Sequence, residues 1–405
     1  EAIYNNDPWR GANAYSQEQL MAYRNGTAGT DWWGETMRST APQTSHNLSV
    51  TGGTERVKYY MSVGYMDQGG ILRSEDWNYK RYNVRSNLSV EITKGLNVEL
   101  GLSGRYDNRK RPYDADNLFR SAQMAIPTYS IYANDNPDYW GGVGDMANPV
   151  HVSDSEYSGN EDRLRREFNG SLPLTWKFPW VKGLIAKALV AYDYTNTEWK
   201  TWRRDLTEYT YDYANEEYVG KEINTAYLES KFENYEKPTY QFSLNYNNTF
   251  AKRHNIGATF VWEMYNDKKN WVTGTRDFAI GLIPDLDYGN DSNQKSSGKT
   301  QKTAHAGWVG RLNYDYGNRY LVEFNFRYDG TYKFQRGNRW GFFPGVSLGW
   351  RVSEEDFFKK LLPDMDNLKI RASYAKVGDE GDFDAFQYLD GYTSHGSYIM
   401  GSGGV

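Results

Sequence analysis

The chain has 405 residues, no cysteine and a formal net charge of −5, with 47 basic and 52 acidic residues intermixed, so neither a nucleic-acid partner nor a disulfide framework is indicated. Its 35 tyrosines and 14 tryptophans are many for a chain with 39% hydrophobic residues and a mean hydropathy of −0.83. No stretch approaches the roughly 18 to 20 consecutive apolar residues of a membrane-spanning helix. Aromatic residues at both membrane interfaces are typical of a β-barrel, whose hydropathy signal is weak.

The first predicted elements are two hairpins in which apolar and polar residues alternate. The first hairpin runs through residues 48–65, and we expect Gly52 and Gly53 to supply the positive φ of a tight turn. The second joins residues 82–92 to residues 96–106. Because strand side chains alternate faces with period two, each strand has an apolar face and a polar face.

The same alternation recurs in the middle of the chain. Residues 168–176 are predicted to pair with residues 184–194, and residues 240–246 with residues 256–262. The first pair is predicted to turn near Lys182 and Gly183, and the second at Lys252, Arg253 and His254. These hairpins repeat the pattern of the first two, so one extended antiparallel sheet is indicated.

The clearest hairpin spans residues 307–329. Its first strand has an apolar face with Trp308, Leu312, Tyr314 and Tyr316 and a largely polar face with Val309, Arg311, Asn313 and Asp315. After a turn at residues 317–319, the second strand has an apolar face with Tyr320, Val322, Phe324, Phe326 and Tyr328 and a polar face with Glu323, Asn325, Arg327 and Asp329. The length of these strands and their aromatic ends favour a barrel in lipid over a soluble sheet.

Two late strands are predicted over residues 346–352 and 368–374. The segment between them indicates one helical turn around Phe357 and Leu361. The whole chain then has about twelve strands, with boundaries uncertain by two to four residues.

Short turns on one side of the strands contrast with long polar connectors on the other side. The connectors cover residues 109–164, 196–237, 266–302 and 330–340. This asymmetry is typical of outer-membrane barrels, whose short turns face the periplasm and whose long loops face outward. A soluble sandwich would instead bury the apolar faces against a second sheet. We therefore predict an all-β fold, an antiparallel transmembrane β-barrel that no linker divides.

Three blocks of this sequence resemble the SusC/RagA family of TonB-dependent transporters. The first block, Thr44–Leu72, reads TSHNLSVTGGTERVKYYMSVGYMDQGGIL and is similar to the segment that follows the plug in that family. The second, Gly307–Phe358, reads GWVGRLNYDYGNRYLVEFNFRYDGTYKFQRGNRWGFFPGVSLGWRVSEEDFF and resembles the central barrel strands. The third, Asn367–Gly381, reads NLKIRASYAKVGDEG and resembles the strand after them.

The resemblance implies a fold and a function. It implies that residues 1–405 are part of the β-barrel domain of a plugged barrel of about 22 strands, with the plug domain and the C-terminal strands absent and a longer native chain. It also implies import of an oligosaccharide or peptide across the cell outer membrane, so the chain is not expected to be an enzyme. The implied partners are outer-membrane lipid, a SusD-like surface lipoprotein, and the TonB complex acting through the absent N-terminal region.

Two alternatives stay open. In one, the chain is a secreted or surface all-β module that holds glycans with loop aromatics and never enters lipid, and it would be soluble without detergent. In the other, it is an outer-membrane hydrolase, which needs a nucleophile and a base. The sequence offers no convincing set of such residues.

No cofactor or metal site is predicted. Five histidines are scattered without a paired metal spacing, namely His46, His151, His254, His305 and His395. Two groups of loop aspartates could bind calcium, and they are Asp135 with Asp138, and Asp285 with Asp287 and Asp291. Neither group follows the EF-hand spacing, so solvated carboxylates are the favoured interpretation.

The candidate substrate-binding residues are aromatic side chains in the connectors, where a flat face can stack on a sugar or a peptide. They are Trp140, Trp199, Trp202, Tyr211 and Trp271. The alternative is that they pack the loops together or contact the partner lipoprotein. Inward charged residues are expected to pair with one another or with the plug, and they include Arg85, Arg105, Arg311, Glu323, Arg327 and Arg371.

Overall fold

Twelve strands form one antiparallel sheet in the computed structural model, which describes residues 17–279, 281, 283–381 and 383–389. They are β1 (Gln43–Gly53), β2 (Val57–Gly69), β3 (Asn78–Thr93), β4 (Leu96–Pro112), β5 (Gly159–Lys177), β6 (Leu184–Arg203), β9 (Tyr227–Phe250), β10 (His254–Asp277), β11 (Lys295–Tyr316), β12 (Tyr320–Thr331), β13 (Trp340–Arg351) and β14 (Lys369–Ala375). Each strand pairs with the next in this order. The predicted number of sheet strands is confirmed.

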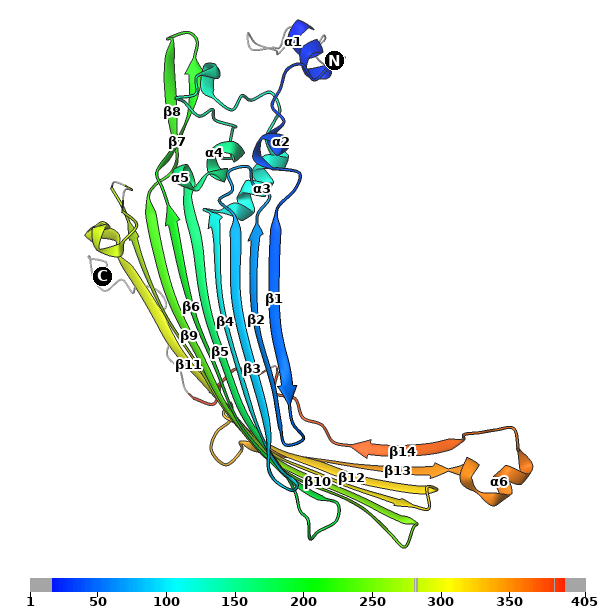
Figure 1. The fold of residues 1–405 in the computed structure, drawn as a ribbon. Helices are drawn as coiled ribbons and strands as arrows, with labels where there is room; N and C mark the ends of the chain where they lie inside the picture. The colour runs from blue at the N-terminus through cyan, green and yellow to red at the C-terminus, as the bar shows by residue number, and fades with distance from the viewer. Residues whose placement is uncertain (1–16, 280, 282, 382, 390–405) are drawn as a thin grey trace, which may run out of the picture.

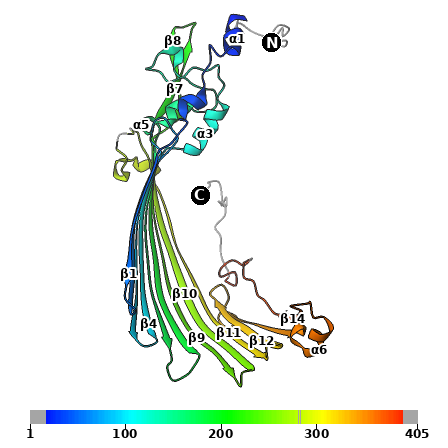
Figure 2. The same cartoon turned by 45° about the vertical axis from the view of Figure 1, so that its right-hand side comes forward.

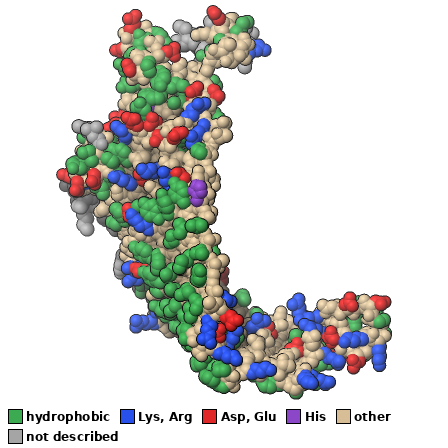
Figure 3. Space-filling model, viewed as in Figure 1, with side chains coloured by type: hydrophobic (Ala, Val, Ile, Leu, Met, Phe, Trp, Pro, Cys, Tyr) green, Lys and Arg blue, Asp and Glu red, His purple; other side chains and the backbone are tan. Residues whose placement is uncertain are grey.

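The sheet is a strongly curved wall, in which β1 to β6 and β9 stand side by side and β12 to β14 swing away from them (Figure 1). Alternate apolar side chains are exposed on one face, for example Leu48 (77%), Val84 (52%) and Leu312 (49%). Hydrophobic side chains gather over the strands in Figure 3. We call this the outer face, and the opposite, polar face the inner face. None of the helices in the described residues has the length and apolarity to span a membrane.

The register of the clearest predicted hairpin is confirmed. Leu312 lies opposite Phe324 on the outer face, and Asn313 lies opposite Glu323 on the inner face. The turn has φ of 56° at Gly317 and 62° at Asn318, which fits the positive φ that a tight hairpin requires. The apolar and polar faces therefore follow from the alternation of residues along each strand.

The first hairpin is present, and its turn confirms part of the prediction. Gly53 has the predicted positive φ, 155°, whereas Gly52 continues the ladder opposite Tyr59. The turn is instead held by Thr54, whose Oγ1 accepts hydrogen bonds from the backbone N–H groups of Arg56 and Val57. A side-chain oxygen thus performs the role that was expected of Gly52.

The predicted connectors at 196–237 and 266–302 were wrong over much of their length. β6 continues to Arg203 and β9 already begins at Tyr227, while β10 continues to Asp277 and β11 begins at Lys295. Polar residues occupy both faces of these strand extensions, so the hydrophobic alternation vanishes although the backbone ladder continues. The connector at 330–340 is confirmed, because β12 ends at Thr331 and β13 begins at Trp340.

A cap of short elements covers the long-loop end of the early strands (Figure 2). It contains α2 (Trp32–Thr36), α3 (Ala115–Met124), η2 (Ala133–Asp135), α4 (Pro149–Ser153), α5 (Ser155–Ser158) and the hairpin of β7 (Leu206–Asp212) and β8 (Glu217–Asn224), with α1 (Gln17–Arg24) further out. Its main apolar cluster is Met37, Leu72, Leu118, Ala122, Val152 and Leu206. The sequence had predicted none of these elements.

Four short helices in the described part of the chain lie outside the cap. They are η3 (Leu286–Tyr288), η4 (Asp291–Asn293), η5 (Val352–Glu354) and α6 (Asp356–Leu361). The helical turn predicted around Phe357 and Leu361 is confirmed by α6. It connects β13 to β14 at the short-turn end of the sheet.

Candidate functional site

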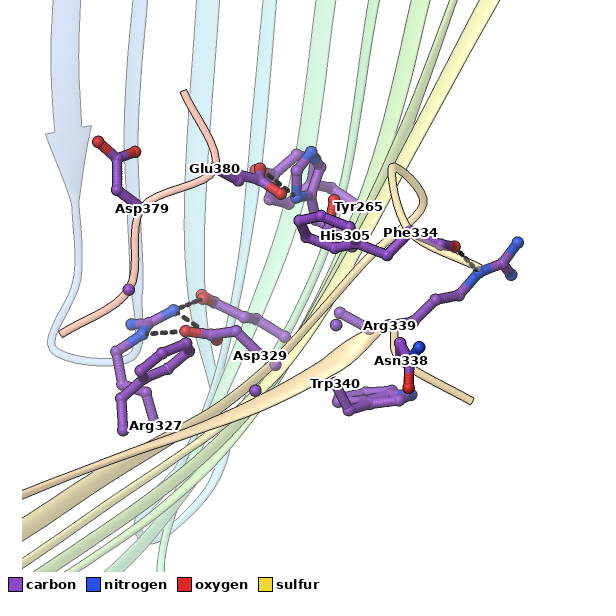
Figure 4. Close-up of a pocket in the computed structure, with 18 residues that line it drawn as sticks. Tyr265, His305, Arg327, Asp329, Phe334, Asn338, Arg339, Trp340, Asp379 and Glu380 are labelled. Carbon is purple, nitrogen blue, oxygen red and sulfur yellow. Dashed lines mark hydrogen bonds and ion pairs between the residues drawn. The ribbon is translucent and has the colours of Figure 1, made fainter. Parts of the chain in front are cut away.

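A cavity of about 330 Å³ lies against the inner face of β10 to β13, which is the region shown in Figure 4. It is lined by three neighbouring rows of residues, each row running across paired strands of the inner face. The middle row places Glu263, Gly307, Asp329 and Gly341 next to one another on successive strands. Polar side chains from this row therefore point into the same space from neighbouring strands.

Arg327 is the centre of the charges in this cavity. Its Nη2 donates to Glu263 Oε1 at 3.1 Å, and its Nε donates to Asp329 Oδ2 at 2.8 Å. The side chain of Arg327 remains 51% exposed, so part of the guanidinium is open to the cavity. One fixed cation between two fixed carboxylates presents both donors and acceptors to a ligand.

Glycines on either side of Asp329 make room for this network. A Cβ at Gly307 would lie 2.5 Å from Asp329 Oδ1, and a Cβ at Gly341 would lie 2.6 Å from Phe343 Cζ. Any larger residue at either position would displace a cavity wall. The absence of side chains at Gly307 and Gly341 is therefore part of how the sequence forms the hollow.

The chain after β14 folds back over the cavity. Lys333 Nζ donates to the backbone carbonyl of Glu380 at 2.7 Å, and the Glu380 carboxylate lies 3.7 Å from His305 Nδ1. The His305 ring stacks on Tyr265, with centroids 4.9 Å apart and an interplanar angle of 24°. Charged, aromatic and backbone groups thus surround a concave site that suits a polar ligand with flat faces.

The five predicted aromatic residues do not form one site. Trp202 is 5% exposed and packs edge-on against Phe278 at 4.9 Å, so its rings are used in an apolar cluster. Trp140 stacks on His151 at 4.5 Å with an angle of 7°. Tyr211 packs edge-on against Tyr213 in the β7–β8 hairpin. These three residues contribute to packing within the cap or just beneath it.

Trp199 and Trp271 are brought together. They lie on the inner faces of β6 and β10, and the Lys231 ammonium on the intervening strand is 4.6 Å from one ring centroid and 5.6 Å from the other. Lys231 and Lys269 also contact Glu233 at 3.3 and 3.1 Å. Both tryptophans therefore belong to paired strands, and the expectation that they lie in loops was wrong.

The cavity of Figure 4 contains none of the five aromatic residues. Of its charged residues, only Arg327 and Asp329 were predicted, as side chains on the polar face of their strand. The pairing of such residues with one another is confirmed for Arg327, as above, and for Arg311, whose Nη2 donates to Glu323 at 2.6 Å. What would have pointed to the cavity is the row of small residues, Gly307 and Gly341, opposite charged neighbours.

The described residues contain no group of three or more His, Asp and Glu side chains arranged to hold a metal ion. Of the loop aspartates considered for calcium, Asp291 is 3.3 Å from Arg276 Nη1. Asp135 lies within η2, where its backbone has a φ of 56°. The absence of a cofactor stays a prediction.

No family model matches the chain. Among curated proteins, it is similar to TonB-dependent receptor SusC of Bacteroides thetaiotaomicron, with 25% identity over 412 residues that cover 93% of this chain and 37% of the relative. It is also similar to TonB-dependent receptor P39 of Formosa agariphila, with 27% identity over 84% of this chain and 31% of the relative. The chain thus spans about a third of the length of the curated relatives it matches.

Among solved structures, this chain is similar to a chain of the RagAB peptide transporter, with a TM-score of 0.68 and 19% identity. The match covers 98% of this chain and 43% of the transporter chain. The RagAB peptide importer in its closed-closed state matches 86% of this chain and 38% of the other, with a TM-score of 0.65 and 20% identity. These matches show a shared fold, that of a TonB-dependent β-barrel transporter. By sequence and by fold, then, this chain is similar to SusC/RagA-type TonB-dependent transporters, as the three sequence blocks predicted.

Proposed function

We propose that this chain forms part of the β-barrel domain of an outer-membrane transporter that imports a nutrient by a TonB-dependent mechanism. The observation that carries the proposal is the two-faced sheet. Side chains such as Leu312 and Phe324 (42% exposed) leave an apolar outer face that water would solvate poorly, and lipid covers such a face. The inner face is polar, and its cavity would bind a substrate without changing it chemically.

The proposed substrate is an oligosaccharide or a peptide. In the cavity, the Arg327 guanidinium can donate hydrogen bonds, and the Glu263 and Asp329 carboxylates can accept them from hydroxyl or amide groups. The stacked pair of His305 and Tyr265 adds a flat surface. Similarity to SusC and to the RagAB peptide transporter supports a transport role, and the chemistry of the cavity is compatible with either substrate class.

We also propose three partners: outer-membrane lipid around the outer face, a SusD-like lipoprotein at the long-loop end, and the TonB complex on the periplasmic side. The cap supports the second of these, because it presents a folded surface at the end where a lipoprotein would close over the barrel. Residues 1–405 would then be one part of the barrel domain, which agrees with the share of the curated relatives that the chain matches. Covalent chemistry has no role in this function.

The test uses the full-length native protein in its own cells. Deletion of its gene should abolish growth on one oligosaccharide or peptide class, and deletion of tonB should give the same defect. The protein should fractionate with outer membranes and require detergent for extraction. Recovery of the intact protein in the soluble fraction would overturn the proposal and would favour a secreted glycan-binding module.

A further inference from the structure

A second feature of the inner face is a group of six arginines on β3, β4 and β5, towards the long-loop end. They are Arg81, Arg105, Arg109, Arg111, Arg163 and Arg165. The register places Arg81 and Arg165 on either side of Asp107, and it places Arg109 directly opposite Arg163. Since neighbouring strands are about 4.8 Å apart, these guanidinium groups share one patch, which we call the arginine wall.

Carboxylates compensate only part of this charge. Asp107 is fully buried between Arg105 Nε at 2.9 Å and Arg163 Nη2 at 3.1 Å, and Glu161 is 2.6 Å from Arg111 Nη2. The remaining carboxylates in contact are Glu167 and, from α3, Asp116. Six arginines against these four carboxylates leave two positive charges in excess.

The excess is concentrated at two residues. Neither Arg81 nor Arg109 has an ion pair with a carboxylate among the described residues, and the buried Nε of each lacks a hydrogen-bond acceptor. The Nε atoms of Arg163 and Arg165 lack one as well. Like charges directly opposite each other across a strand pair destabilise a sheet, and buried donors are normally satisfied. An anion on the wall would offset the repulsion between these like charges.

Aromatic rings flank the same row. Tyr79 lies opposite Arg109 on one side, and Trp199 lies opposite Arg163 on the other. The row from Tyr79 to Trp199 crosses three strand gaps and so spans about 14 Å. Guanidinium groups bind carboxylates in a bidentate manner, and aromatic rings stack on the apolar face of a sugar ring.

We propose that the arginine wall binds an acidic oligosaccharide, one whose sugar rings carry carboxylates. The inference rests on the proposed function and specifies the class of its substrate. The arginines hold the carboxylates, and Trp199 and Tyr79 contact the rings between them. This site lies on β3 to β6 and is separate from the cavity on β10 to β13.

The experiment measures binding of an oligogalacturonate to the full-length protein in detergent by calorimetry, with a neutral galacto-oligosaccharide and an oligoglutamate peptide as comparison probes. The wild type should bind the oligogalacturonate in preference to the neutral sugar, with an affinity that falls as ionic strength rises. Arg109→Gln should weaken this binding at least tenfold, which corresponds to about 1.4 kcal/mol. It should not lower the melting temperature, because it removes a like-charge contact.

The matched control is Arg85→Gln, which alters an inward arginine of the neighbouring strand, β3, opposite Ser103 and therefore six residues along β4 from Arg109. It should leave affinity for the oligogalacturonate nearly unchanged. Equal affinity of the wild type for charged and neutral sugars, or an unchanged affinity in Arg109→Gln, would overturn the inference. Tighter binding of oligoglutamate than of oligogalacturonate would also overturn it and would indicate an acidic peptide as the occupant. If instead growth on every nutrient survives gene deletion, the proposed function itself fails.

Discussion

The orientation of the sheet in lipid can be tested with two adjacent residues of β11. Leu312 points to the outer face and Asn313 to the inner face, opposite Phe324 and Glu323 respectively. Replacing each residue by arginine introduces the same side chain and the same charge at neighbouring positions of one strand. The two substitutions place that charge on opposite faces, so the pair tests whether the outer face contacts lipid.

The magnitude follows from the position of Leu312 along the strand. It is four residues from Tyr316, where β11 ends, and therefore about 13 Å along the strand or about 10 Å in height at the usual strand tilt. The apolar band of such barrels is about 25 Å tall, which puts Leu312 near its middle. Arginine at that depth costs about 2 to 4 kcal/mol. Asn313→Arg places the guanidinium near the Glu323 carboxylate in a polar environment, so we expect a change within about 0.5 kcal/mol.

The assay is urea unfolding of the full-length protein folded into lipid vesicles, followed by the shift of the folded barrel on cold gel electrophoresis. Leu312→Arg should lower the urea midpoint clearly, and Asn313→Arg should leave it near the wild-type value. Equal effects at the two positions would show that the outer face does not contact lipid. A larger effect at Asn313 would show that the two faces have been exchanged.

Three further predictions concern the cavity, the apolar cluster around Trp202 and the short-turn end. Gly307→Val should lower affinity for the imported substrate. The new Cβ would lie 2.5 Å from Asp329 Oδ1 and would break the contact between Asp329 and Arg327. Wild-type affinity in calorimetry would contradict a role for this cavity. Trp202→Ala should destabilise the region around Phe278 by about 3 to 5 kcal/mol and expose its backbone amides to hydrogen exchange. Trp199 is only half-buried, so Trp199→Ala should leave the exchange of these amides unchanged. Hydrogen bonds from Tyr320 and Trp350 lower the pKa of Glu355. The ionised carboxylate therefore stabilises the fold in full above the ordinary carboxyl pKa, and this stabilisation is lost as the pH falls through the lowered pKa of Glu355. Glu355→Gln should therefore make the melting temperature less sensitive to acid than that of the wild type, and parallel pH profiles would refute the assignment.

The strands of the sheet could be predicted from the sequence wherever one face is apolar. Leu312, Tyr314 and Tyr316 alternate with Arg311, Asn313 and Asp315, and this alternation fixed both the element and the register. Beyond the apolar zone the same inference fails. Trp199 pairs with Lys231 in a regular ladder, yet both faces of those strands are polar, so no periodicity in hydrophobicity distinguishes strand from loop there.

The cap could not be predicted for a different physical reason. Its helices are short, α2 having five residues and α5 four, and such segments are stable only through tertiary contacts. Leu72, Leu118 and Leu206 come from distant parts of the chain and form one cluster. Isolated apolar residues in separate segments between strands carry no local signal that they meet, so the sequence did not indicate the cap.

The inner face shows what strand alternation can and cannot reveal about a site. Alternation identifies which charged residues face inward, and it assigned Arg105, Arg311 and Arg327 correctly. Only the pairing register reveals whether those charges are compensated. Arg311 pairs with Asn325, two residues from Glu323, and forms an ion pair with Glu323, whereas Arg109 faces Arg163 across the ladder and has no ion pair among the described residues. Two strands with the same alternation can therefore build a neutral wall in one part of the sheet and an anion-attracting wall in another.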